Sequence, residues 1–179
     1  NFLEAQGVAS AGSIADFAGR IGGVGSTLGV SAGQILGVSA TLDELSVNAE
    51  RGSSGFIRIL QRVAAAPEAF ADAADVSTSD FKKLVNEDLF GAVQLFITKL
   101  NDRGLSNTEL QTTLKDLKLN GVGTAEVVSK LGQNMELLST RVGQATKTVK
   151  ESSSVTQEFE KKNQTLGASL EKVSNSFTE

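Results

Sequence analysis

The chain has 179 residues, of which 40% are hydrophobic, and it carries a formal net charge of −4. It contains no His, Cys, Trp or Tyr, a single Met and a single Pro. The lack of His and Cys excludes an imidazole base, a thiolate nucleophile, disulfides and the usual zinc and iron–sulfur ligands. The net acidity excludes a chain-wide basic field for nucleic acid, and the length allows one or two structural units.

The first residues have neither a basic cluster nor an apolar run, so they do not have the pattern of a signal peptide. The chain also begins without an initiator Met. We therefore expect it to be an internal piece of a longer protein.

The longest stretch without a charged residue is 21–42. Four glycines recur in it every four residues, namely Gly25, Gly29, Gly33 and Gly37. This spacing allows helices to approach closely in a membrane. Because only about ten of these twenty-two residues are apolar, the stretch is too polar for a spanning helix of about 20 mostly apolar residues. The pattern instead favours a helix that ends at Gly29 in a left-handed cap and another that begins after Ser31.

Three segments have the pattern of a helix N-terminus. Each has a Ser after an apolar residue and a polar side chain three residues later; the pairs are Ser31 with Gln34, Ser77 with Asp80, and Ser106 with Glu109. The hydroxyl group can accept from the backbone N–H three residues on, while the polar side chain reaches back to the Ser amide. Asp80 is shorter than Glu109, so the middle start is the weakest.

Apolar residues recur at three- and four-residue intervals over 56–63 and 81–100, which is the spacing of helices. Pro67 is placed to end a helix that begins near Asn48 and to start a short successor. No segment alternates clearly enough for a strand. We therefore predict an all-α fold in which residues 1–120 form a small compact unit of five to seven short helices.

The C-terminal segment, residues 121–179, has a different pattern. Positions that alternate four and three residues apart are mostly apolar from Leu131 onward, over about 47 residues. This 3.5-residue period is typical of a coiled coil, because the apolar stripe stays buried only against a partner helix. We predict a self-association seam formed by Leu131, Met135, Leu138, Val142, Val149, Phe159, Leu166, Leu170, Val173 and Phe177. Poor helix formers at 152–154 leave two forms open, a long helix or a helical hairpin.

Few patterns in the chain point to chemistry. The acidic pairs Asp43-Glu44 and Glu87-Asp88 are adjacent in sequence, so on a helix their side chains diverge and suit solvated surface. The run 22–27 has the glycines of a phosphate-binding loop but lacks the Lys and the preceding strand. Lys82-Lys83 and similar basic clusters have acids nearby. We predict no catalytic residue, cofactor site, metal site or specific nucleic-acid contact.

Five segments within about residues 10–105 form an ordered series: Ile14–Ile21, Ser31–Leu45, Ala49–Gly52, Phe81–Val85 and Asp88–Ala92. Together they resemble the core region of phage tail tape-measure proteins. The resemblance implies a structural, non-enzymatic role, because such proteins lie as helical multimers in the tail tube and set tail length during assembly. It also implies homo-oligomers and contacts with tail-tube, tail-tip or assembly-chaperone proteins. The implied location is the virion tail lumen, and the host bacterial cytoplasm during assembly; membrane contact is not supported.

Two other functions remain open from the sequence. The seam is equally typical of a bacterial coiled-coil scaffold or adaptor unrelated to phage. A peptidoglycan-cleaving domain could use an acid such as Glu44 or Glu50, although such chemistry requires two carboxyl groups that face each other across a groove.

Overall fold

The computed structural model describes residues 11–121 and 123–153. Within these residues the fold is all-α, which confirms the predicted class. The helices are α2 (Ala11–Thr27), α3 (Ala32–Glu44), α4 (Ala49–Ala65), α5 (Pro67–Ala74), α6 (Thr78–Glu87), α7 (Leu89–Asp102), α8 (Asn107–Asp116) and α9 (Thr124–Gln133). A further helix, which we call the C-terminal helix, occupies residues 135–153.

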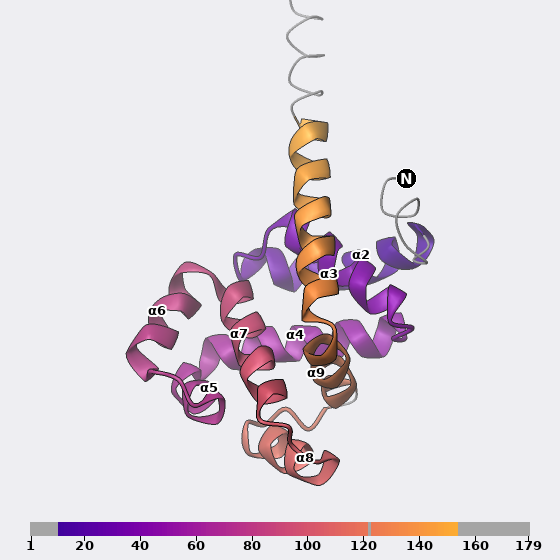
Figure 1. The fold of residues 1–179 in the computed structure, drawn as a ribbon. Helices are drawn as coiled ribbons and strands as arrows, with labels where there is room; N and C mark the ends of the chain where they lie inside the picture. Colours follow the sequence, from indigo (N-terminus) through magenta and orange to yellow (C-terminus); the bar gives the residue numbers. More distant parts are fainter. Residues whose placement is uncertain (1–10, 122, 154–179) are drawn as a thin grey trace, which may run out of the picture.

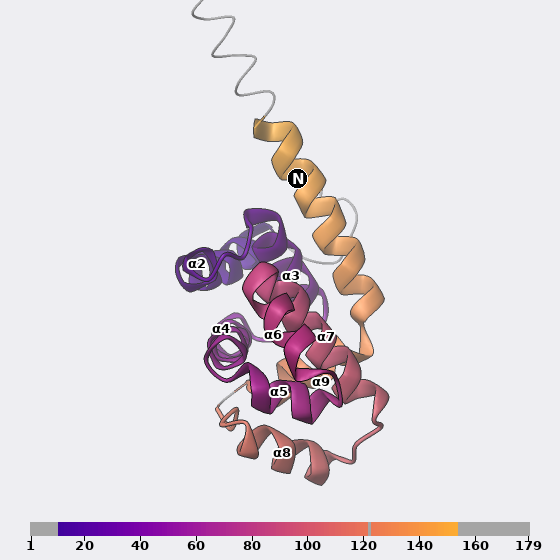
Figure 2. The same cartoon turned by 90° about the vertical axis from the view of Figure 1, so that its left-hand side faces the viewer.

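The central element of the compact part is α4, which runs through its middle (Figure 1). It packs against α2 and α3 at one end, against α5 and α7 at the other, and against α9. α6 packs on α5 and α7, and α8 packs on α9. The C-terminal helix runs along one side of this assembly and extends past α3, as both views show (Figures 1 and 2).

The helix starts follow the predicted capping pattern. Ser31 and Ser106 each form a complete capping box, in which the Ser hydroxyl accepts from the third backbone N–H and the third side chain accepts from the Ser amide. The amide of Asp80 also donates to Ser77 Oγ, at 3.4 Å, but the reciprocal bond is not formed there. The start of α6 at Ser77 is therefore the weakest of the three, as we predicted from the shorter side chain of Asp80.

The predicted boundaries around Pro67 are also confirmed. The side chain of Asn48 caps α4 by accepting from the amide of Arg51 at 3.1 Å. Pro67 occupies the first position of α5, where its missing N–H leaves no bond unmade. Gly29 ends the turn after α2 with a φ of 81°, a left-handed conformation that glycine adopts without a steric penalty.

The core is built largely from aromatic and aliphatic side chains of α2, α4, α5, α6 and α7. Six phenylalanines of the described residues are almost completely buried: Phe17, Phe56, Phe70, Phe81, Phe90 and Phe96. The rings of Phe70 and Phe96 meet edge to face with centroids 4.8 Å apart, a favourable arrangement for aromatic pairs. These contacts join α5 to α7.

The compact unit extends beyond the predicted division between residues 120 and 121. Val127, Val128 and Leu131 of α9 are buried in the same core cluster as residues of α4 and α7. Their burial makes α9 part of the compact unit, so the change of character lies at Asn134, after α9. The helix stops there for one residue and resumes at Met135.

Candidate functional site: the docked C-terminal helix

The four regularly spaced glycines have three different roles. Gly25 lies where α2 meets α3, since a Cβ atom there would be 3.4 Å from the side chain of Ile35. Gly29 ends α2. Gly33 and Gly37 are buried on α3 and face the C-terminal helix.

Gly33 and Gly37 allow the backbones of α3 and the C-terminal helix to touch. A Cβ atom on Gly33 would lie 2.7 Å from the Cα atom of Thr146, and one on Gly37 would overlap the backbone of Val142. Gly33 and Gly37 are four residues apart on α3, as are Val142 and Thr146 on the C-terminal helix. The two contacts therefore lie about one helical turn apart on both helices. The close approach that the glycine spacing suggested therefore occurs, but between two helices of the folded chain. No helix among the described residues is long and apolar enough to cross a membrane.

A largely buried ion pair fixes the position of the C-terminal helix. Nη2 of Arg141 lies 2.8 Å from Oε2 of Glu44, and Nε donates to the same oxygen at 2.8 Å. The two side chains are only 8% and 19% exposed. A second amino group of Arg141 donates to Gln144 Oε1 at 2.9 Å. This arrangement satisfies a buried guanidinium group with acceptors from two helices.

The charge of Arg141 also suits the end of α3. Glu44 is the last residue of α3, and the last turn of that helix has no basic residue. The C-terminus of a helix carries a partial negative charge, so a carboxylate there is unfavourable unless a cation lies nearby. Arg141 supplies that cation from a segment 97 residues away in sequence.

The apolar face of the C-terminal helix completes the contact. Leu138 is buried in the main core, and Val142 packs against it. Ala145 is fully buried in a second small cluster with Ile14 of α2 and Ala40 of α3. The C-terminal helix is thus held by α2, α3 and the main core together.

The predicted seam is therefore divided. Leu131 and Leu138 are buried within the chain, and Met135 and Val142 pack against the main core. Val149 is partly buried, whereas residues 150–153 are exposed. The first part of the seam packs against the compact unit of the same chain, whereas the sequence predicts that it packs against a second chain. The remaining predicted seam residues lie outside the described residues: Phe159, Leu166, Leu170, Val173 and Phe177.

Of the acids considered for catalysis, Glu44 and Asp88 bind partners within the fold, and Glu50 is exposed. Glu44 is engaged by Arg141, and Glu50 lies exposed in the first turn of α4. Asp88 caps α7 by accepting from the amide of Gly91 at 2.9 Å. The described part of the chain has no group of three or more acids placed to hold a metal ion. The glycine-rich run 22–27 forms the last part of α2. It is therefore helical and does not form a phosphate-binding loop.

Several arginines and one lysine of the described surface reach acids or carbonyl groups. Lys82 pairs with Glu68 at 2.7 Å, and Arg51 lies 3.5 Å from Glu126. Arg62 donates to the carbonyl oxygen of Leu117 at 3.2 Å, and Arg103 to that of Ala73 at 2.7 Å. These four contacts join neighbouring segments of the fold, so these four side chains have structural partners.

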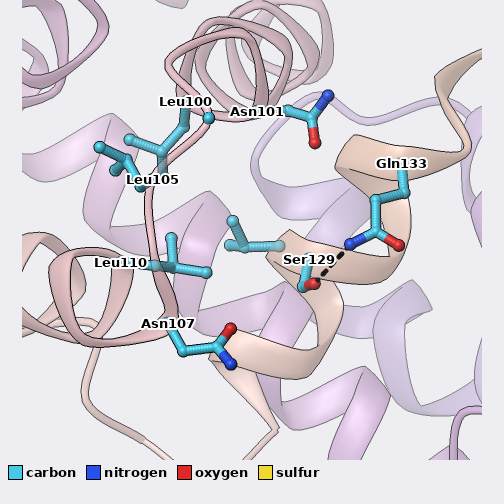
Figure 3. Close-up of a pocket in the computed structure, with 9 residues that line it drawn as sticks. Leu100, Asn101, Leu105, Asn107, Leu110, Ser129 and Gln133 are labelled. Carbon is cyan, nitrogen blue, oxygen red and sulfur yellow. Dashed lines mark hydrogen bonds between the residues drawn. The ribbon is translucent and has the colours of Figure 1, made fainter.

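A small half-open cavity of about 120 Å³ lies where α7, α8 and α9 meet (Figure 3). Leucines and Val128 form its apolar wall, and neutral polar side chains also line it, including Asn101, Asn107 and Gln133. Nε2 of Gln133 donates to Ser129 Oγ at 3.2 Å across this rim. None of the lining residues titrates, so the cavity offers no acid or base. Its volume corresponds to a few water molecules at about 30 Å³ each.

The sequence did not identify Arg141 as a functional residue or assign Gly33 and Gly37 to this contact. A signal for the glycines was present in their four-residue spacing, but no feature of the sequence identified the facing helix. Comparison of the chain with protein-family models, with curated proteins and with solved structures gives no match.

Proposed function

We propose that this chain is a non-enzymatic structural module that self-associates through its seam. The part of the seam that we mean lies beyond the region of the C-terminal helix that docks on α3. The observation that carries the proposal is that the compact unit covers the seam only as far as about Val149. Val149 is still partly buried, and 150–153 are exposed on a helix that extends past α3 (Figure 1). The same 4-3 apolar pattern continues in the sequence to Phe177.

An apolar stripe along a helix is stable in water only where another surface covers it. A helix with a 3.5-residue apolar period needs a second helix to cover its stripe. The compact unit covers the stripe up to about Val149, and beyond that point a coiled-coil helix or a helical hairpin would have to provide the cover. A coiled coil with another copy of the chain is the form that we propose.

We further propose that the parent protein is a phage or prophage tail tape-measure protein. The ordered segments between Ile14 and Ala92 support this proposal by their resemblance to that family's core region. A ruler requires a constant length per residue, and an α-helix supplies about 1.5 Å per residue. Its partners would then be sister chains and the tail-tube, tail-tip or chaperone proteins of the assembling tail, in the host cytoplasm and later in the virion tail lumen.

Self-association can be tested by sedimentation of the full chain with two matched variants. Leu170→Asp places a charge on the seam, whereas Ser169→Asp places the same charge one position away. We expect Leu170→Asp to lower the association state, because burial of an unpaired carboxylate is unfavourable, and Ser169→Asp to leave it unchanged. Equal behaviour of both variants would contradict the proposed seam.

The tail assignment requires a separate test, since a bacterial scaffold would also self-associate. The complete reading frame and its neighbouring genes should encode tail-tube, baseplate and tail-assembly proteins. Co-expression with the neighbouring tail-tube protein should then give a complex that copurifies. A neighbourhood without tail genes would favour the scaffold instead.

A further inference from the structure

The break between α9 and the C-terminal helix consists of one residue. Asn134 has φ and ψ of −132° and 37°, outside the helical region, and helices lie directly on both sides. Its Nδ2 group donates to the carbonyl oxygen of Lys130 at 2.8 Å, and its backbone N–H reaches Leu131. A continuing helix would give that Lys130 oxygen a backbone partner instead, so one side chain stabilises the bend.

Nothing in the local sequence requires a break. Asn134 is neither Pro nor Gly, and no Pro lies between 123 and 153. The apolar 4-3 pattern passes through the bend without interruption, from Leu131 to Met135 and Leu138. On a straight helix these residues would share one face. The sequence is therefore compatible with both a bent and a straight connection.

A straight connection would remove the C-terminal helix from α3. It would expose Leu138 and Ala145, which are at most 1% exposed in the bent form, and would separate Arg141 from Glu44. It would also expose Gly33 and Gly37, which the backbone of the C-terminal helix covers in the bent form. These losses make the straight form unfavourable for a single chain.

A second copy removes that penalty. The contacts of the docked helix with α2 and α3 join residues far apart in sequence, such as Arg141 with Glu44, so either copy can supply the helix. The face of α3 that contacts the C-terminal helix has a negative charge at the end that receives Arg141, and two glycines at the spacing of Val142 and Thr146. Its features are complementary to this helix in charge and shape.

We infer that residues 135–153 form an exchangeable arm, which straightens at Asn134 and docks on α3 of a second copy of the chain. Such an exchange recovers every docked contact and changes only the hinge, which is the usual route to domain-swapped dimers. The inference goes beyond the proposed function, because it uses residues 134–149 and does not depend on the distal seam or on a phage origin.

Complementary charge reversal tests the exchange in the full chain. Arg141→Glu and Glu44→Arg each place like charges in the chain's own contact. In a mixture of the two variants, an exchanged pair restores both ion pairs, because each arm meets the opposite charge on the other copy. A single chain with both substitutions restores the contact internally and serves as the control for folding.

Native mass spectrometry of an isotope-labelled mixture provides the measurement. We expect mixed pairs to exceed their statistical share strongly, and the doubly substituted chain to behave like the wild type. Association through the distal seam alone would give statistical proportions, so that result would overturn the exchange while leaving the proposed function intact. Mixed pairs that persist in a Leu170→Asp background would support the exchange even where the distal seam fails.

A hinge variant decides the question if the charge-reversed chains lose helicity. Asn134→Ala removes the side-chain bond to Lys130 and raises helix propensity at the bend. Ser139→Ala raises propensity at an exposed position within the arm and is the matched control. We expect labelled and unlabelled Asn134→Ala chains to exchange partners several-fold faster than Ser139→Ala chains, and equal rates would overturn the inference.

Discussion

Arg141 and Glu44 form a bidentate contact to one carboxylate oxygen, with both donor nitrogens at 2.8 Å and both side chains largely buried. This pair connects the C-terminal helix to the end of α3, where the helix dipole alone would disfavour Glu44. Burying an ion pair is costly, and the contact is favourable only because each group meets its partner.

Removing either partner should therefore destabilise the chain more than removing both. We expect Arg141→Met or Glu44→Gln to lower the free energy of unfolding by about 2–3 kcal/mol, because each leaves a buried charge without its partner. The double variant should lose clearly less than the sum of the two. Denaturant unfolding analysed as a double-mutant cycle measures this coupling, and additive losses would show that the pair is unimportant.

The close contacts at the glycines of α3 predict that an added methyl group there destabilises the chain. Gly37→Ala places a methyl group against the Val142 backbone and should destabilise the chain by about 1–3 kcal/mol, the usual range for overpacking. Gly23→Ala is the matched control, since it lies within α2 with no neighbouring atom within 4 Å of the added carbon.

The control should stabilise the chain by about 0.5–1 kcal/mol, because alanine restricts the unfolded state and favours the helix. Hydrogen exchange should also show faster exchange of amides in 138–149 for Gly37→Ala and not for Gly23→Ala. If both variants changed the stability of the chain in the same direction, that result would contradict the close approach of α3 and the C-terminal helix.

The capping interactions differ in strength along the chain. Ser106→Ala removes the hydroxyl group of a complete capping box and should cost about 1 kcal/mol. Ser77→Ala removes the 3.4 Å bond from the amide of Asp80 and a 3.0 Å hydroxyl contact with Ser79, but no complete capping box, and should cost less. Thermal unfolding of both variants checks the order, and a larger loss at Ser77 would contradict the observed geometry.

Acid should weaken the cap of α8. Hydrogen bonds from the hydroxyl and amide groups of Ser106 lower the pKa of Glu109 below its ordinary value of 4.5. A carboxyl group with a lowered pKa in the folded state contributes stability above its unfolded pKa and loses it as the pH falls through the folded pKa.

The stability advantage of the wild type over Glu109→Gln should therefore be present at about pH 7 and should shrink below about pH 4.5. Glu87→Gln is the control, because Glu87 is exposed and its side chain has no partner in the described part of the chain. Unfolding curves over this pH range provide the measurement. A constant difference between the wild type and Glu109→Gln would exclude a contribution from the charge of Glu109.

The amino-acid sequence determined the elements of this fold that depend on neighbouring residues. The caps at Ser31 and Ser106, the boundary at Pro67 and the all-α class all follow from interactions within a few residues, and the structure confirms them. Tertiary structure alone decided what covers the apolar stripe. The 4-3 pattern requires a partner surface but does not specify it, and at Leu138 and Ala145 that surface is the chain's own core and α3.

The same distinction explains Asn134, Arg141 and Gly37. Local propensity permits a straight helix at Asn134, but in the structure the chain bends there and the following helix docks on α3. Arg141 and Gly37 acquire their roles from residues about one hundred positions away, through a charge at the end of α3 and a close backbone approach. Contacts of that range depend on how helices pack in space, which no local pattern in the sequence contains.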